Sequence, residues 1–171
     1  MNDEKGQLSG EYMLLVGSLI VVLMISIFMI ANENELNIAM AAAKSGADEG
    51  VASSSSAIYP KETFNEYDDM EGLKHPYSVS IVNVSYNSSG IDENYGKQKI
   101  QFKVYAKASV DYNKKELDSI GDRINYNLRK SVATSFNTAN STNKLYNPVF
   151  SNNYVFTTAN VVSVSYTHLR A

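Results

Sequence analysis

The hydrophobic residues of the chain are concentrated near its N-terminal end, in one run that contains no charge. This run extends from Tyr12 to Ala31 and reads YMLLVGSLIVVLMISIFMIA. Its roughly 20 residues are enough for a helix to cross a bilayer core of ~30 Å. Helices of soluble proteins keep a polar face, so an all-round apolar run of this length predicts a membrane-spanning helix.

A helical pattern continues beyond the apolar run as a narrower stripe. Apolar residues recur at three- and four-residue steps, at Leu36, Met40, Ala43, Ala47 and Val51. No proline precedes Pro60, so one helix is predicted from about Glu11 to Ala52, on the order of 60 Å long at 1.5 Å per residue. Gly46 and Gly50 are expected to weaken this helix by ~1 kcal/mol each relative to alanine.

The rest of the chain predicts a small head. Residues 77–86 and 99–110 read as strands, and the second alternates strictly between apolar and polar residues. Residues 87–96 between them predict a hairpin loop that is too long for a two-residue turn. Another strand is predicted at 154–166.

An amphipathic helix is predicted between these strands. Its apolar stripe consists of Leu117, Ile120, Ile124, Leu128, Val132 and Phe136. Asn113 and Glu116 have the spacing of a capping box at its start. The predicted fold class is therefore α+β: a long N-terminal hydrophobic and amphipathic helix, then a small head in which one helix packs against an antiparallel β-sheet.

Composition and charge exclude several classes of function. The 171 residues carry a net charge of -3 with a pI of about 5.4, so no global field favours nucleic acid. Without cysteine, neither a disulfide framework nor a thiolate metal site can form. The chain contains no phosphate-binding glycine loop, His-Glu-x-x-His or Gly-x-Ser-x-Gly motif. We therefore expect no enzymatic activity, no cofactor and no metal.

Three local features have a simple interpretation and a functional alternative. Asp68, Asp69 and Glu71 lack the ligand spacing and glycine of a calcium loop, so a solvated loop or short helix is favoured over a cation site. His75 precedes a proline and is expected to be a surface residue rather than a general base. The head is locally basic, at Lys103, Lys107, Lys114, Lys115, Arg123, Arg129 and Lys130. A solvated face is favoured there over adhesion to acidic glycans or DNA contact during uptake.

Two ordinary explanations of the N-terminus leave something unexplained. A cleaved secretory signal has an apolar core of roughly 7–15 residues, a basic start and a nearby small-x-small site. Here the run is longer, Asp3 and Glu4 oppose Lys5, and Ala39-Met40-Ala41 lies far beyond it. A plain single-pass anchor accounts for the apolar run, and on hydropathy alone it is favoured. It gives Glu11 no role except to mark the membrane boundary, since a deeper carboxylate costs several kcal/mol unless it reaches water or a cation.

The residues before the apolar run have a specific spacing, Gln7-x-Ser9-x-Glu11-x-x-x-Leu15. This motif resembles the class III signal of archaeal type IV pilin-like proteins, particularly the methanogen pilin group. The resemblance covers the motif, and the long helix behind it agrees with the family. The head carries no motif that we can match to the family.

The resemblance implies processing by a prepilin peptidase, on the cytoplasmic side, between Gly6 and Gln7. Residues 1–6 would be a leader, 7–56 the N-terminal helix with 12–31 spanning the membrane, and 57–171 an extracellular head. In the wider pilin family, a glutamate at the position of Glu11 is thought to neutralise the N-terminal amine of a neighbouring subunit. A buried carboxylate is tolerated when it is paired in this way.

Further expectations follow for assembly and modification. Gly17, Ser18 and Ser26 would allow close helix approach, and the Ala-rich residues 39–43 would pack against the head or adjacent subunits. Asn83, Asn87 and Asn140 begin Asn-x-Ser/Thr acceptors. In a chain so rich in these residues such motifs arise by chance, so the expectation of N-glycosylation comes from the family resemblance.

The expected function is that of a structural subunit of an archaeal type IV pilus-like surface filament, which begins in the membrane as a precursor. The expected partners are the peptidase, identical or related pilin subunits, the membrane and, through adhesion, surface glycans; nucleic acid is not expected. The alternative is a membrane-anchored or accessory surface protein that is processed without polymerising. An anchored enzyme or substrate-binding domain is disfavoured because the head offers no site.

The C-terminal sequence VSYTHLRA resembles the translated adapter tail at the end of some truncated environmental gene reads. Residues from about Val164 onward would then not be native. For that reason His168 and Arg170 are given no role.

Overall fold

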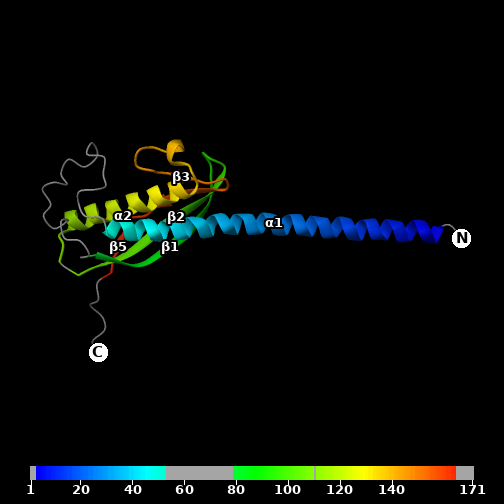
Figure 1. The fold of residues 1–171 in the computed structure, drawn as a ribbon, viewed down its shortest axis with the longest axis horizontal. Coiled ribbons are helices and arrows are strands. Elements are labelled where there is room, and N and C mark those ends of the chain that lie inside the picture. The colour runs from blue at the N-terminus through cyan, green and yellow to red at the C-terminus, as the bar shows by residue number, and fades with distance from the viewer. Residues whose placement is uncertain (1–2, 53–78, 110, 165–171) are drawn as a thin grey trace, which may run out of the picture. The chain divides into compact units, whose positions relative to one another are not determined.

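The computed structural model describes residues 3–52, 79–109 and 111–164 (Figure 1). The expectations for Asp68, Asp69, Glu71 and His75, and for the tail with His168 and Arg170, fall outside the described residues. The elements in chain order are α1 (Asp3–Ala52), β1 (Val79–Asp92), β2 (Lys97–Ala108), α2 (Lys114–Ser135), the 3-10 turn η3 (Ala139–Ser141), β3 (Val149–Phe150), β4 (Tyr154–Thr158) and β5 (Val162–Ser163).

Helix α1 begins earlier than its sequence pattern predicts. It starts at Asp3 rather than near Glu11, so its backbone is already helical at Gly6 and Gln7. The described residues fall into two compact units, which divide the helix after Asn37. The apolar run belongs to the first unit, whereas the helix from Ile38 onward belongs to the second unit together with the head.

The sheet is mixed, so the predicted antiparallel sheet is wrong in this respect. Its strand order is β1-β2-β4-β3, and β5 pairs with β2 beyond the end of β4. The β1–β2 and β3–β4 pairs are antiparallel, but both β4 and β5 run parallel to β2. After β2 the chain passes through α2 to β3, and the reversal between the antiparallel strands β3 and β4 then leaves β4 parallel to β2. The coarser prediction of a long apolar N-terminal helix followed by an α+β head is confirmed.

The hairpin loop between β1 and β2 is shorter than residues 87–96. The strands continue to Asp92 and Lys97 and leave only four turn residues between them. The turn is closed by a hydrogen bond from the Gly96 amide to the Asp92 carbonyl oxygen (2.8 Å). A register shift between Ser88 and Ile91, with Gly90 at a φ of 81°, lets β1 carry one extra residue without ending.

The final strand also differs from its prediction. The predicted strand at 154–166 is two short strands, because pairing with β2 stops after Thr158 and resumes at Val162. Strand β3, which is only two residues long, was not predicted. Its residues Val149 and Phe150 pair with Phe156 and Val155 of β4.

The core lies between the sheet and α2, as the two periodicities predict. The alternate residues Ile100, Phe102, Val104 and Ala106 of β2 are buried, and so are Ile120, Ile124, Leu128 and Val132 of α2. The Phe156 ring stacks on Phe102 and on Phe136, with centroid distances of 5.6 Å and 5.7 Å. Because Phe136 follows α2, this stack fixes the end of the helix against the sheet.

The last part of α1 packs against α2 through residues with little or no side chain. Ala39, Ala43 and Ala47 are fully buried. A Cβ atom added at Gly46 would lie 2.6 Å from the Asn127 carbonyl oxygen and 2.8 Å from Leu128 Cα. At Gly50 the added atom would lie 2.9 Å from Ile124 Cα. The glycines expected to weaken α1 therefore permit the two helices to touch backbone to backbone.

The capping box of α2 is confirmed. The Asn113 side chain accepts a hydrogen bond from the Glu116 amide, and the Glu116 carboxylate accepts one from the Asn113 amide, both at 2.9 Å. Replacing Asn113 with alanine is expected to lower the free energy of unfolding of the head by ~1 kcal/mol. Urea unfolding followed by circular dichroism would measure this loss. Asn113→Asp keeps the acceptor and serves as the control; an equal loss in both variants would contradict the capping role.

Candidate functional site: the apolar helix and the surface of the head

The first unit of the chain offers an uncharged apolar surface. Helix α1 is long and apolar enough to span a membrane, and no part of its most apolar window is buried within the chain. Large side chains are exposed along the whole run; Leu14, for example, is 75 % exposed and Phe28 is 69 % exposed. Such a surface is stable only in lipid or against other apolar surfaces.

Polar groups inside the apolar run have their hydrogen bonds within the helix. The Ser18 hydroxyl donates to the Leu15 carbonyl oxygen (2.8 Å), and the Ser26 hydroxyl donates to the Val22 carbonyl oxygen (2.9 Å). A hydroxyl satisfied in this way costs little in a lipid environment. A Cβ added at Gly17 would meet nothing within 4 Å. Gly17 and Ser18 thus form a small-residue patch on the exposed helix surface, where another helix could approach closely.

The motif residues lie at the start of the same helix. Gly6, Gln7 and Ser9 lie in the first turns of its backbone, and the described side chains begin at Gly10. Glu11 and Leu15 are exposed. With Tyr12 next to it, Glu11 is placed where the charged segment gives way to the apolar one.

The candidate glycosylation sites are exposed in the head. Asn83 and Asn87 lie on β1, and Asn140 lies in η3. In the third acceptor, the Thr142 hydroxyl donates to the Pro148 carbonyl oxygen at 2.5 Å. Asn87 was expected in a loop, but it pairs with Gln101 in the β1–β2 ladder.

The basic residues of the head do not form one solvated face. Arg123 is only 6 % exposed. Arg129 Nε donates to the Leu145 carbonyl oxygen (3.0 Å), and its Nη1 donates to the Thr158 hydroxyl (2.5 Å). These arginines therefore have structural positions that their sequence context did not indicate. Of the lysines, Lys103 and Lys107 lie on β2, whereas Lys114, Lys115 and Lys130 lie on α2.

Two groups near Arg129 have shifted pKa values. Desolvation by burial raises the pKa of the Asp122 carboxyl; Arg129 opposes this shift, and Asp118 adds to it. Desolvation also raises the pKa of the Tyr126 hydroxyl, as do the charge of Tyr146 and the hydrogen bond between the two side chains. The two rings are 5.5 Å apart.

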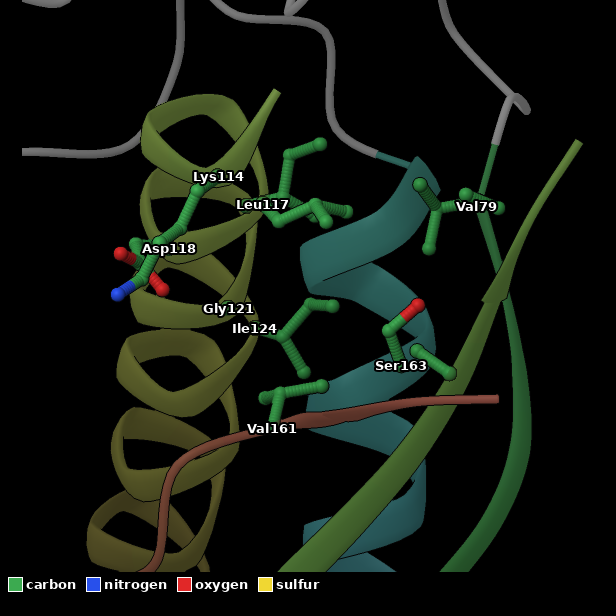
Figure 2. A pocket seen from close by; sticks show the side chains of 11 residues that line it. Val79, Lys114, Leu117, Asp118, Gly121, Ile124, Val161 and Ser163 are labelled. Carbon is green, nitrogen blue, oxygen red and sulfur yellow. The ribbon is translucent and has the colours of Figure 1, made fainter. Parts of the chain in front are cut away.

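A small cavity of about 180 Å³ lies at the N-terminal end of α2 (Figure 2). Leu117, Ile124 and Val161 line it with apolar side chains, while Lys114 and Asp118 add polar atoms. Among residues 3–52, 79–109 and 111–164, no three His, Cys, Asp or Glu side chains gather as metal ligands would. The described cavity has the chemistry of a gap in the core.

The apolar helix is therefore the feature that separates this chain from an ordinary small domain. Comparisons with protein-family models, curated proteins and solved structures find no match.

Proposed function

We propose that this chain is the structural subunit of an archaeal type IV pilus-like surface filament, made as a precursor and assembled through α1. One observation carries the proposal: an exposed, uncharged apolar helix lies directly behind Gln7-x-Ser9-x-Glu11-x-x-x-Leu15. The apolar run accounts for residence in the membrane. The motif accounts for the residues in front of the run, which an ordinary anchor leaves unexplained.

Two environments are suited to the same helix surface. Before assembly, lipid would cover the apolar side chains of residues 12–31. After assembly, the helices of neighbouring copies would cover them, and the small-residue patch at Gly17 and Ser18 would let two backbones approach closely. Packing in both states needs no change in the helix itself.

Glu11 has a defined role in this proposal. A prepilin peptidase would cut between Gly6 and Gln7 and make Gln7 the N-terminal residue of the mature subunit. The Glu11 carboxylate would then pair with the N-terminal amine of a neighbouring copy. In a low dielectric each charge makes the other tolerable, so the pair would favour assembled over isolated subunits.

The head would face the outside of the cell and determine the surface properties of the filament. In the last part of α1, Ala39, Ala43 and Ala47 are already buried within a single chain, so they leave no exposed side chain for contacts with other copies. Assembly contacts would therefore come from the part of α1 before Ile38.

The N-terminus of the mature chain tests the processing step. Intact-mass analysis of the chain from its native membrane or surface should give a protein that begins at Gln7. A chain that still carries residues 1–6 would contradict processing. Sheared surface filaments should contain the same mature chain; a processed chain that is found only in the membrane would instead identify an anchored accessory protein.

A further inference from the structure

One face of the β1–β2 ladder is polar and basic, and it is the face that α2 does not cover. Every second residue of β2 from Ile100 to Ala106 points into the core, so the residues between them point outward. The register places Ser80, Asn83, Ser85 and Asn87 of β1 opposite Lys107, Tyr105, Lys103 and Gln101 of β2. We call this set the lysine face: Ser80, Asn83, Ser85 and Asn87 of β1, and Lys99, Gln101, Lys103, Tyr105 and Lys107 of β2.

The charges of the lysine face have one sign except at its end. Lys103 and Lys107 are exposed, and the β1 residues opposite them are serines. Lys103 Nζ lies 5.3 Å from the centroid of the Tyr105 ring, which restricts where the ammonium group can go. At the end of the face, Lys99 Nζ lies 3.8 Å from an Asp92 carboxylate oxygen. The centre of the face is therefore a positive surface with a partly preorganised lysine.

The uncharged members of the face are suited to hydroxyl groups. Asn83 and Asn87 are exposed amides that can both donate and accept, and Ser85 between them carries a hydroxyl. Sugar rings present many hydroxyls that need such paired donors and acceptors. Lysines beside the amides would bind carboxylate or sulfate groups on the same rings.

The spacing of the lysines distinguishes between two kinds of anionic polymer. Lys103 and Lys107 are four strand residues apart, which is roughly 13 Å at about 3.3 Å per residue. Nucleic acid carries a phosphate about every 3.4 Å along each strand and is bound by dense basic groups and stacked aromatic side chains. The lysine face has no arginine, and Lys103 lies over its one aromatic ring. Widely spaced cations among amides fit an acidic polysaccharide, in which whole sugar rings separate the acid groups.

We propose that the lysine face binds acidic polysaccharide. The inference rests on the proposed function in one respect, that the head is exposed at the cell surface where such polymers occur. The net charge of the whole chain is -3, so the attraction is local to this face rather than global. Binding is therefore expected to weaken steeply with salt, because the screening length falls from ~10 Å at 0.1 M to ~3 Å at 1 M.

The test uses the full chain in detergent micelles and immobilised polygalacturonate as the probe. Asn83 and Asn87 lie on the face, so intact mass must first show that they are unmodified. The double variant Lys103→Gln/Lys107→Gln is expected to lower affinity roughly tenfold, since two partly exposed charge pairs are lost. Lys44→Gln/Lys130→Gln makes the same charge change at two exposed helical positions and should bind as the unmodified chain does.

Three results would overturn the proposal. Equal losses in the two double variants would show that charge matters but this face does not. Equal binding to neutral dextran would remove the role of the acid groups. Single-stranded oligonucleotide bound as tightly as polygalacturonate, with the same loss in Lys103→Gln/Lys107→Gln, would show a general polyanion surface. None of these results depends on filament formation, so they are separable from a failure of the proposed assembly.

Discussion

A Glu11→Gln chain is expected to be cleaved normally and to form almost no filaments. The amide cannot neutralise the amine of a neighbouring subunit, which would then be buried without a counter-charge. Removing one partner of a buried pair costs about 3–5 kcal/mol. The loss is repeated at every subunit, so even the lower value would strongly disfavour elongation. The measurement compares sheared filament yield with the amount of mature chain in the membrane.

Glu33→Gln provides the matched control for this experiment. Glu33 is an exposed carboxylate on the same helix, beyond the apolar run, and it has no assigned role in assembly. The control chain should form filaments at the level of the unmodified chain. If Glu11→Gln were cleaved and assembled at that level too, pairing between Glu11 and the amine would be refuted. A processed Glu11→Gln chain that accumulates in the membrane is the expected outcome.

Replacing Gly46 with valine should destabilise the head by at least ~3 kcal/mol, the upper part of the range for overpacking. The added Cβ alone would approach Asn127 O to 2.6 Å and Leu128 Cα to 2.8 Å. Both are backbone atoms, so no side chain can rotate away, and the helices must separate. Urea unfolding of the full chain in detergent, followed by the near-ultraviolet circular dichroism of its 12 tyrosines, would measure the loss.

Ser45→Val separates this steric effect from the effect of valine on helix formation. Ser45 is the exposed neighbour of Gly46 in the same turn of α1. Valine there lowers helix propensity by less than ~1 kcal/mol and meets no packed surface. A Gly46→Val chain as stable as Ser45→Val would mean that α1 and α2 do not pack at the described distance.

Elements with a strong local period could be predicted from the sequence. The alternation from Ile100 to Ala106 gave the core face of β2, and the stripe from Ile120 to Val132 gave the core face of α2. Asn113 and Glu116 marked the start of that helix. In each case the pattern is set by neighbours a few residues away, so it can be read without the rest of the fold.

Features that depend on distant pairing could not be predicted in this way. The direction of β4 follows from the path of the chain through α2 and β3, which no residue of β4 encodes by itself. From sequence alone Gly46 only lowers helix propensity; its role in close packing is evident only once the position of Leu128 in α2 is known. In the sequence, Arg123 and Arg129 counted as members of a basic surface. In the structure Arg123 is buried, and Arg129 is hydrogen-bonded to Leu145 and Thr158.

The candidate functional features also differ in whether they could be predicted from local sequence. The apolar run could be predicted because its signal is composition over one continuous segment. The lysine face could not, because its members come from two strands whose register decides which residues share a side. The cleavage motif stays a prediction that the N-terminus of the mature chain will decide.

The early start of α1 at Asp3 gives the proposed cut a second consequence. In an α-helix the amides of residues 7–10 donate to the carbonyl oxygens of residues 3–6. Removing residues 1–6 would turn the Gln7 amide into the terminal amine and leave the amides of residues 8–10 without these acceptors, one turn before Glu11 and at the edge of the apolar run. The precursor would have its own unpaired amides at the first residues of α1, in the charged segment, whereas those of the mature subunit would lie beside the apolar run. Cutting would thus move the unsatisfied end of the helix to a place where another copy, rather than water, would supply the acceptors.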